Sequence, residues 1–516
     1  MRENRVKIVL AALIASTLAG GLLTGCGGQK AGSGTGNITP VTMLLLGNKP
    51  TNGRADAAIA EINKIVGPRI GVELRTEYVE WADWQNQYQL RLASGDSGLD
   101  LVVTATDWLY AWEIARKGGF YPLTPELIRE NATQTWAEIP QTHWDLCTEN
   151  GAIWFIPEDQ YSQYTNHGMF WRKDWAAEAG IREVATFEGL EQYWDAVKKN
   201  HPEAYPWDIS GAEYMDMGLV SGYIQGKRPI QIIIGTAAGN YNIFHYENSN
   251  PFTVVSYYMD GDDLVEAAKT FDRFAQKGFW REDVLNYRGE TRNLLLAGLS
   301  GSDEHHTQTF IGLREQMDKE QPGSDLQMYW WGMENNNVNK DLLTHGAMAV
   351  NAASKNVEKA LQLYDLLRND KQIYLLYNYG IEGKDYVVLP DGKFSRPEGF
   401  NSSTDNLDTN FWAGRMDKFE PEWDTWWSGR TAFIERLNSF AMEYPLGKFS
   451  FDNTNVAAEM AAVGDVCATY IPSIHFGKTG NPEKAVADFR AALKAAGYDK
   501  VKAEIQAQLT AYKNSL

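Results

Sequence analysis

Cysteine is scarce in this chain of 516 residues, which contains only Cys26, Cys147 and Cys467. A metal site made of clustered cysteines is therefore excluded, and so is a dense disulfide framework. Cys147 and Cys467 lie far apart in the sequence, which leaves both a bridge and two buried free thiols open. We favour two free thiols.

Positive charge is also in deficit. The chain has 48 Lys and Arg residues against 67 Asp and Glu residues, and its formal net charge is −19 at pH 7. Such an anionic protein is a poor partner for nucleic acid or for anionic lipid. We therefore expect no nucleic-acid partner, although the net charge does not report the charge inside a pocket.

Long apolar runs are missing except near the start. Residues 8–23, IVLAALIASTLAGGLL, follow the basic residues Arg2, Arg5 and Lys7. This run is short for a membrane span, which needs about 20 residues, and is typical of an export signal. No other apolar stretch approaches about 18 residues, so the sequence predicts no second membrane segment.

Common catalytic motifs are absent too. The sequence has no G-x-S-x-G, no H-E-x-x-H, no P-loop and no G-x-G-x-x-G after a strand. The adjacent acidic pairs at 158–159 and 303–304 resemble glycosidase carboxylates only superficially, because neighbouring side chains usually point apart. The pair His305-His306 matches no metal-binding spacing. We expect a protein that is not an enzyme and that needs no cofactor or metal.

Aromatic residues, by contrast, are abundant, with 18 Trp, 25 Tyr and 20 Phe. Tryptophan is seldom fully buried, so some of these rings are expected to line a groove. The chain is also much longer than a single core can fill, which predicts two or more lobes. Short apolar runs alternate with helical periodicity, as in 41–47 (strand), 56–66 (helix) and 99–103 (strand), and this alternation predicts an α/β fold.

One stretch, SGDSGLDLVVTATDWLYAW (94–112), places Asp107 and Trp108 directly after a predicted buried strand. Ligands of open α/β sheets bind at this edge. An indole offers a flat apolar face to the C–H side of a sugar ring, and a carboxylate binds sugar hydroxyls. The pair therefore favours a sugar site, with a core position as the alternative for Trp108. Trp112 is expected in the core.

The end of the apolar run, LLTGCGG, resembles the lipobox of bacterial lipoproteins. The resemblance implies a signal peptide over 1–25, cleavage before Cys26 and a lipid on its thiol. The Gly- and Ser-rich residues 26–37 then form a flexible tether. A signal peptide with a chance cysteine is the alternative.

Several motifs occur in a familiar order. VEWADWQNQYQLRLASGDSGLDLVV (79–103), GGFYPLTPEL (118–127), FWRKDWAAEAGI (170–181) and AASKNVEKALQLYDLL (352–367) resemble the family 1 extracellular solute-binding proteins of bacterial carbohydrate importers. The tail resembles the C-terminal domain of unknown function of the larger lipoproteins in this group.

The resemblance implies a two-lobed periplasmic-binding-protein fold, with a ligand cleft between α/β lobes joined by hinge strands. We expect lobe one over 38–157 plus 326–352, and lobe two over 158–325 plus 353–516, with a C-terminal helical region at 405–516. It also implies a monomer, lipid-anchored outside the cytoplasm, that captures an oligosaccharide by hinge closure and delivers it to ABC transporter permease subunits. The alternatives are a binder of a non-sugar solute and a surface polysaccharide-degrading enzyme.

Candidate ligand-binding residues are aromatic or acidic side chains near predicted strand ends and hinges: Trp81, Trp84, Asp107, Trp108, Glu158, Asp159, Tyr161, Trp330, Trp331, Trp412 and Arg415. Of Trp81 and Trp84, one is expected to pack and the other to line the cleft. Trp330 and Trp331 point to opposite faces of a strand, so one of them should be core. In relatives the segment of Trp412 enters the cleft from lobe two.

The sequence also departs from the family pattern. SDEHH (302–306) is unusual, and it leaves ligand roles near 300–310 open. The acidic D-x-D-x-D-G loop of some large relatives has no match, so we expect no calcium site of that kind. The identity, charge and length of the sugar stay open.

Overall fold

The computed structural model describes residues 38–81, 84–160, 164, 166–210, 218–289, 291–401 and 404–516. Its buried apolar residues form three clusters, called here the first, second and third core. The first core contains Val41, Ile62 and Val102, the second contains Phe310, and the third contains Phe271. This division indicates a chain of several packed units, as its length predicts.

The first core is built on a five-stranded sheet with the strand order β2-β1-β3-β14-β6. Its strands are β1 (Thr39–Leu46), β2 (Val72–Val79), β3 (Leu101–Thr104), β6 (Ile156–Pro157) and β14 (Ala347–Val350). β1 pairs in parallel with β2 and β3, whereas β14 runs antiparallel to β3 and β6. The strands β3 and β14 are buried at every position, because helices cover the sheet.

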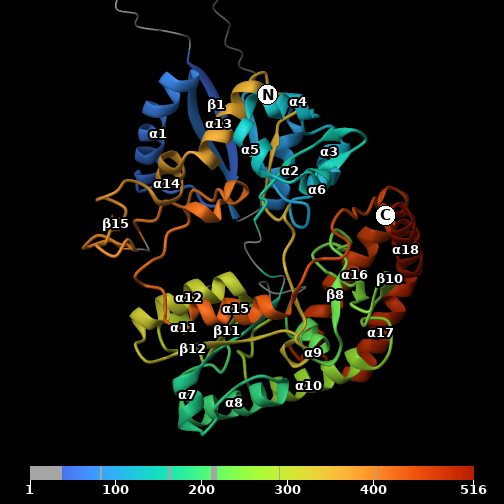
Figure 1. Ribbon diagram of the computed structural model, residues 1–516. Coiled ribbons are helices and arrows are strands. Elements are labelled where there is room, and N and C mark those ends of the chain that lie inside the picture. The colour runs from blue at the N-terminus through green and yellow to red at the C-terminus, as the bar shows by residue number, and fades with distance from the viewer. Residues whose placement is uncertain are drawn as a thin grey trace, which may run out of the picture. The chain divides into compact units, whose positions relative to one another are not determined.

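Helices around this sheet complete the first core (Figure 1). They are α1 (Arg54–Ile70), α2 (Trp84–Ala93), α3 (Ala111–Arg116), α4 (Pro125–Asn131), α5 (Thr133–Glu138), α6 (Gln141–Asp145), α13 (Val357–Asn369) and α14 (Lys371–Tyr379). α1 buries Ile59, Ile62 and Val66, which recur at helical spacing. The strands and helix predicted at 41–47, 99–103 and 56–66 are confirmed, each extended or shifted by a few residues.

A second sheet has β7 (His167–Arg172) between β11 (Ser302–His306) and β12 (Leu326–Trp330), all antiparallel. Side chains alternate across it: Phe170 belongs to the second core, whereas Met169 and Trp171 belong to the third. Both faces of this sheet are therefore buried. The second core is closed by α11 (Arg292–Leu296), α12 (Thr307–Glu320) and α15 (Arg430–Phe440).

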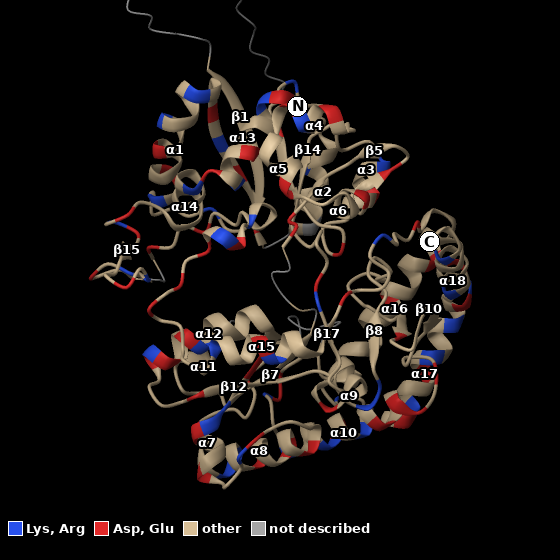
Figure 2. Ribbon diagram, in the orientation of Figure 1, with Lys and Arg blue, Asp and Glu red and all other residues tan. Residues whose placement is uncertain are grey.

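The third core lies on the other face of that sheet and extends to the C-terminal helices. Its elements are β8 (Ile230–Ile232), β9 (His245–Glu247), β10 (Asn250–Val255), α7 (Lys173–Glu178), α8 (Phe187–Asn200), α9 (Leu219–Lys227), α10 (Asp263–Lys277), α16 (Ala457–His475), α17 (Pro482–Ala495) and α18 (Tyr498–Ser515). Charged side chains of both signs occur along α10 and α17 (Figure 2), the solvated faces of amphipathic helices.

Short pairings complete the fold: β4 (Thr148–Glu149) with β5 (Ala152–Ile153), β13 (Val338–Asn339) with β17 (Ala441–Met442), and β15 (Val387–Val388) with β16 (Phe394–Ser395). Within the described residues, the chain passes between the first core and the other two at 158–160 with 164 and 166, at 340–346, and at 414–429. Three crossings agree with the several hinge strands that the resemblance implies.

The lobe boundaries expected from the sequence need three corrections. β12 was expected in lobe one, but it pairs with β7 and contributes to the second core. α13 and α14 were expected in lobe two, but they pack on α1 and in the first core. The helical region expected over 405–516 is also wrong at its start, since Phe411 and Ala413 belong to the first core. These segments lie far in sequence from their packing partners, and only tertiary contacts reveal the pairing.

Cys147 and Cys467 are free and buried, as favoured above. Burial raises the pKa of both thiols, that of Cys467 to about 12. Among the described residues, no helix combines the length and the apolar character that a membrane crossing requires. The expected signal peptide, tether and lipidated Cys26 lie outside the described residues.

Candidate functional site

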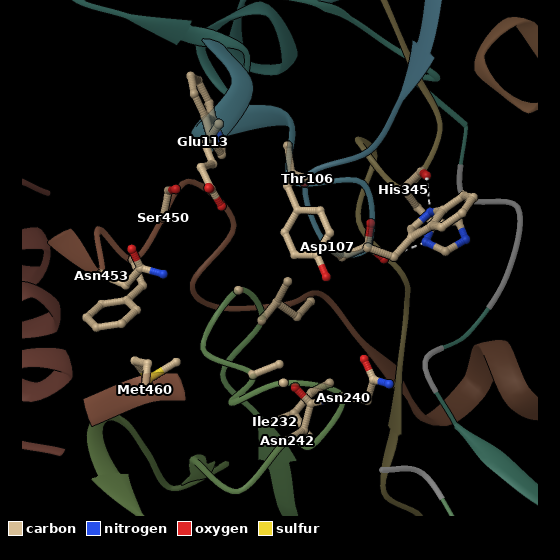
Figure 3. A pocket seen from close by; sticks show the side chains of 18 of the residues that line it. Thr106, Asp107, Glu113, Ile232, Asn240, Asn242, His345, Ser450, Asn453 and Met460 are labelled. Carbon is tan, nitrogen blue, oxygen red and sulfur yellow. Dashed lines mark hydrogen bonds and ion pairs between the residues drawn. The ribbon is translucent and has the colours of Figure 1, made fainter. Parts of the chain in front are cut away.

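A cavity of about 780 Å³ is lined by segments that pack with the first core and by segments that pack with the third core. Such a volume suits a small-molecule ligand. The first-core side supplies the loop after β3 and the start of α3; the third-core side supplies 232–242 and 450–454. Figure 3 shows side chains from these segments around it, among them Glu113, Asn240 and Asn453, and the interaction of Asp107 with His345 as a dashed line.

Four indole rings gather at one end of this cavity, and all four were candidates from the sequence. Trp108 lies next to Trp84, Trp81 and Trp412, at ring-centroid distances of 5.4, 6.2 and 5.9 Å. Trp81 and Trp412 are 6.0 Å apart. Trp84 and Trp108 line the cavity itself, whereas Trp81 and Trp412 lie beside them without lining it, and Trp81 is 40% exposed. We call these four residues the tryptophan cluster.

Trp412 reaches the cluster from an unexpected direction. It lies in η3 (Trp412–Gly414) and packs against the first core, the same core as Trp108. The expectation that this ring enters from lobe two is therefore wrong. Tyr364, in α13, donates its hydroxyl to the carbonyl of Ala413 at 2.7 Å and so helps to hold η3 against the first core.

The loop that carries Trp108 is anchored to the crossing at 340–346. The indole N–H of Trp108 donates to the carbonyl oxygen of His345 at 3.1 Å, so this group is already used. The backbone N–H of Thr106 donates to the carbonyl of Thr344 at 3.1 Å. Because the N–H of Trp108 is used in this way, the face of its ring is the part that can contact a ligand. The loop ends at Tyr110, whose backbone is left-handed with φ 56°.

Asp107 faces His345 from this loop. Nδ1 of His345 lies 2.6 Å from Oδ2 of Asp107 and 3.2 Å from Oδ2 of Asp341. Burial alone would lower the pKa of His345, but the two carboxylates outweigh burial and raise it to about 10. These three groups lie close enough together for a metal ion, and such an ion would have to displace the proton that the raised pKa places on His345.

Glu158 and Asp159 occupy the first crossing, but they do not line the cavity. Glu158 is buried, its N–H donates to the carbonyl of Gly346 at 2.8 Å, and a Cβ on Gly346 would approach its Oε2 to 3.0 Å. Asp159 pairs with His143 and lies 3.8 Å from Arg368. The backbone of Glu158 and the carboxylate of Asp159 thus help to hold the crossing in place. Neither of these two predicted ligand-binding residues lies on the wall of this cavity.

Trp330 and Trp331 are both core residues, each about 1% exposed. The sequence placed them on opposite faces of a strand, and this is confirmed: Trp330 belongs to the second core and Trp331 to the third. The inference that one of them lines the cleft is wrong, because both faces of that sheet are covered.

Two further candidates contribute less. Arg415 donates from Nε to Oδ1 of Asp417 at 2.7 Å and does not line the cavity. Tyr161 lies outside the described residues. Trp112 is among the lining residues, but it is 6% exposed and packs edge-to-face on Phe155 at 4.8 Å, as expected for a core residue.

The sequence missed the polar wall on the third-core side. Asn240, Asn242 and Asn453 line the cavity, and they come from loops without a recognisable motif. The unusual SDEHH segment was a better signal: His306 lines the cavity together with His167, which stacks on His305 at 5.2 Å. Burial, followed by the charge of His167, lowers the pKa of His306 to about 3, so its ring is neutral near pH 7.

Comparison with known proteins agrees with this architecture. The sequence family described as "Bacterial extracellular solute-binding protein" matches residues 57–381, and a domain of unknown function, DUF3502, matches 445–514. The chain therefore belongs to the bacterial extracellular solute-binding protein family. The second match covers the loop at 450–454 and the helices α16 to α18, so part of the cavity wall comes from this domain.

Relatives cover nearly the whole chain. A carbohydrate ABC transporter substrate-binding protein of Streptococcus pneumoniae is 23% identical over 96% of this chain and 95% of its own length. The crystal structure of NgtS, an N-glycan transport solute binding protein of the same species, matches with a TM-score of 0.73 and 19% identity, over 93% of this chain and 100% of that one. The alginate-binding protein AlgQ2 matches with a TM-score of 0.62 and 17% identity, over 92% and 99%. These structures share the fold.

Proposed function

We propose that this protein captures an oligosaccharide and delivers it to the permease of an ABC importer. The observation that carries the proposal is the tryptophan cluster at the end of the cavity, in a chain of the solute-binding family. A relative that covers nearly the same length is named as a carbohydrate ABC transporter substrate-binding protein, which supports the same class of ligand.

The chemistry of the cavity suits sugar rings. The apolar face of an indole packs on the C–H face of a pyranose and loses little conformational entropy in doing so. Asn240, Asn242 and Asn453 on the opposite wall can both donate to and accept from hydroxyl groups. Stacking on one wall and amides on the other would hold a ring by its face and by its rim.

Hinge closure is the proposed mechanism of capture. We assign lobe one to 39–157 plus 347–413 and lobe two to 166–340 plus 430–516, joined by the three crossings. The tryptophan cluster then belongs to lobe one and the amide wall to lobe two. A ligand that contacts both walls stabilises the closed form, because only closure makes both sets of contacts.

Anchoring outside the cytoplasm completes the proposal. Residues 1–25 act as the export signal, Cys26 receives a lipid, and 26–37 tether the folded body to the membrane surface. A tethered binding protein keeps its ligand close to the permease, which raises the effective concentration of the loaded form.

A thermal-shift screen combined with small-angle scattering tests the function. An oligosaccharide ligand is expected to raise the melting temperature by mass action and to decrease the radius of gyration. If amino acids, peptides or metal chelates stabilise the protein and no oligosaccharide does, the ligand class is wrong. If the oligosaccharide is shortened during incubation, the protein is an enzyme instead.

A further inference from the structure

The basic side chains that line the cavity are paired with carboxylates. Arg116 faces Glu149 with both Nη2 and Nε, at 3.1 and 3.4 Å from its carboxylate oxygens. Nζ of Lys117 lies 2.5 Å from Oε1 of Glu113. Each of these cations therefore has a nearby carboxylate that offsets its attraction for an anionic ligand.

The histidines at the cavity also leave no positive charge without a neighbouring carboxylate. His345 lies between Asp107 and Asp341. Nδ1 of His167 lies 2.9 Å from Oε1 of Glu304, so a proton on this ring would also face a carboxylate. His306 is a neutral ring near pH 7 because burial lowers its pKa.

Carboxylates outnumber the cations of Lys and Arg on the cavity wall. Asp107, Glu113, Asp341 and Asp452 line it, against Arg116 and Lys117. Asp452 accepts hydrogen bonds from the N–H and the hydroxyl of Thr454 at 3.0 and 2.6 Å, which lower the pKa of its carboxyl and keep it charged.

The segments that the structure does not describe cannot supply a cation after residue 38. They are 82–83, 161–163, 165, 211–217, 290 and 402–403, and they contain no Lys, Arg or His. An anionic group that enters the cavity would lose part of its hydration shell. It would also meet the carboxylates of the wall, while the lining Lys and Arg residues are already paired with carboxylates. Both effects oppose its binding.

We propose that the cavity selects uncharged oligosaccharides and discriminates against chains that carry uronate, sialate or sulfate groups. This inference rests on the proposed function and narrows its ligand class. Neutral chains need only hydroxyl recognition and stacking, which the amides and the tryptophan cluster supply, and they bring no charge to the acidic wall.

Calorimetry with matched ligands tests the selection. The probes are gluco-, manno- and galacto-oligosaccharides of four to six units, each with a derivative in which a primary hydroxyl is oxidised to a carboxylate. For the uncharged chain that binds, the oxidised form is expected to bind at least about tenfold more weakly at low salt, because like charges are juxtaposed. The difference should narrow as salt screens the repulsion.

A variant of the protein tests the same selection from the side of the cavity wall, by removing a carboxylate that pairs with a lining cation. Glu149→Gln removes the partner of Arg116 and should raise the relative affinity for the oxidised chain. Glu73→Gln is the matched control, since Glu73 pairs with Arg75 in an exposed position on β2 away from the cavity lining. This control should leave the discrimination unchanged.

Three results overturn the inference. An oxidised chain that binds as tightly as its uncharged parent, or more tightly, refutes the selection while leaving carbohydrate binding intact. Equal effects of Glu149→Gln and Glu73→Gln assign the discrimination to net charge and not to this cavity. If no chain of either set binds, the proposed carbohydrate function fails, and the inference fails with it.

Discussion

The rings of Trp108 and Trp412 lie 5.9 Å apart in an edge-to-face arrangement, although 304 positions separate the two residues in the chain. Both pack against the first core. They therefore belong to one aromatic cluster on a single core, and not to two walls that would meet only on closure. A preformed wall reduces the entropy cost of binding a sugar ring.

Loss of either ring should weaken binding more than folding. Trp108→Ala and Trp412→Ala are each expected to lower the affinity for the oligosaccharide by about 1–3 kcal/mol, the range of an anchoring residue. Stability should fall less than for a core residue, because both side chains are only partly buried and leave no sealed cavity. Titration calorimetry and urea unfolding of the same samples measure the two effects.

Trp330 and Trp331 should behave in the opposite way. Each is about 1% exposed, so replacement by Ala should cost about 3–5 kcal/mol of unfolding free energy. Affinity, measured under conditions where the variant is folded, should stay near that of the wild type. A variant at either position that folds normally but no longer binds sugar would restore these residues to the site.

The pairing of His345 predicts a pH dependence of stability. Its pKa is raised to about 10 by Asp107 and Asp341, against 6.5 for an ordinary histidine. The folded state thus retains a proton that the unfolded state loses above pH 6.5. The stabilisation is complete below that pH and is lost as the pH rises through about 10.

His345→Asn serves as the comparison for this effect. Between pH 6.5 and 10 the wild type should lose stability relative to the variant in denaturant unfolding. Parallel pH profiles of the two proteins would show that His345 is not held as a cation. Trp108 provides a second readout, because its indole N–H bonds the carbonyl of His345 and its fluorescence should respond to the substitution.

The lipid anchor is tested by Cys26→Ser. This variant should lack the lipid and partition away from membranes. Cys147→Ser is the matched control, since Cys147 is buried and free in the folded body; it should still carry the lipid and remain with the membrane fraction. Cys26→Ser protein that stays on membranes after a salt wash would contradict the lipobox interpretation.

Local patterns were sufficient for much of this protein. The apolar run of Val41–Leu46 predicted a buried strand, and the spacing of Ile59, Ile62 and Val66 predicted a helix. The position of Asp107 and Trp108 after β3 predicted their place at the edge of the sheet, because parallel strands end there together. Such features depend on neighbouring residues, and the sequence alone determined them, together with the family.

The role of each tryptophan was decided only by tertiary structure. Trp330 and Trp331 alternate across a strand as the sequence predicted, but only the fold covers both faces. Trp412 and α13 belong to the first core through contacts with segments hundreds of residues away. Periodicity reports which way a side chain points along its own element. The residues that lie opposite that side chain depend on long-range packing. The pairing of Arg116 with Glu149 and the raised pKa of His345 beside Asp107 depend on it for the same reason.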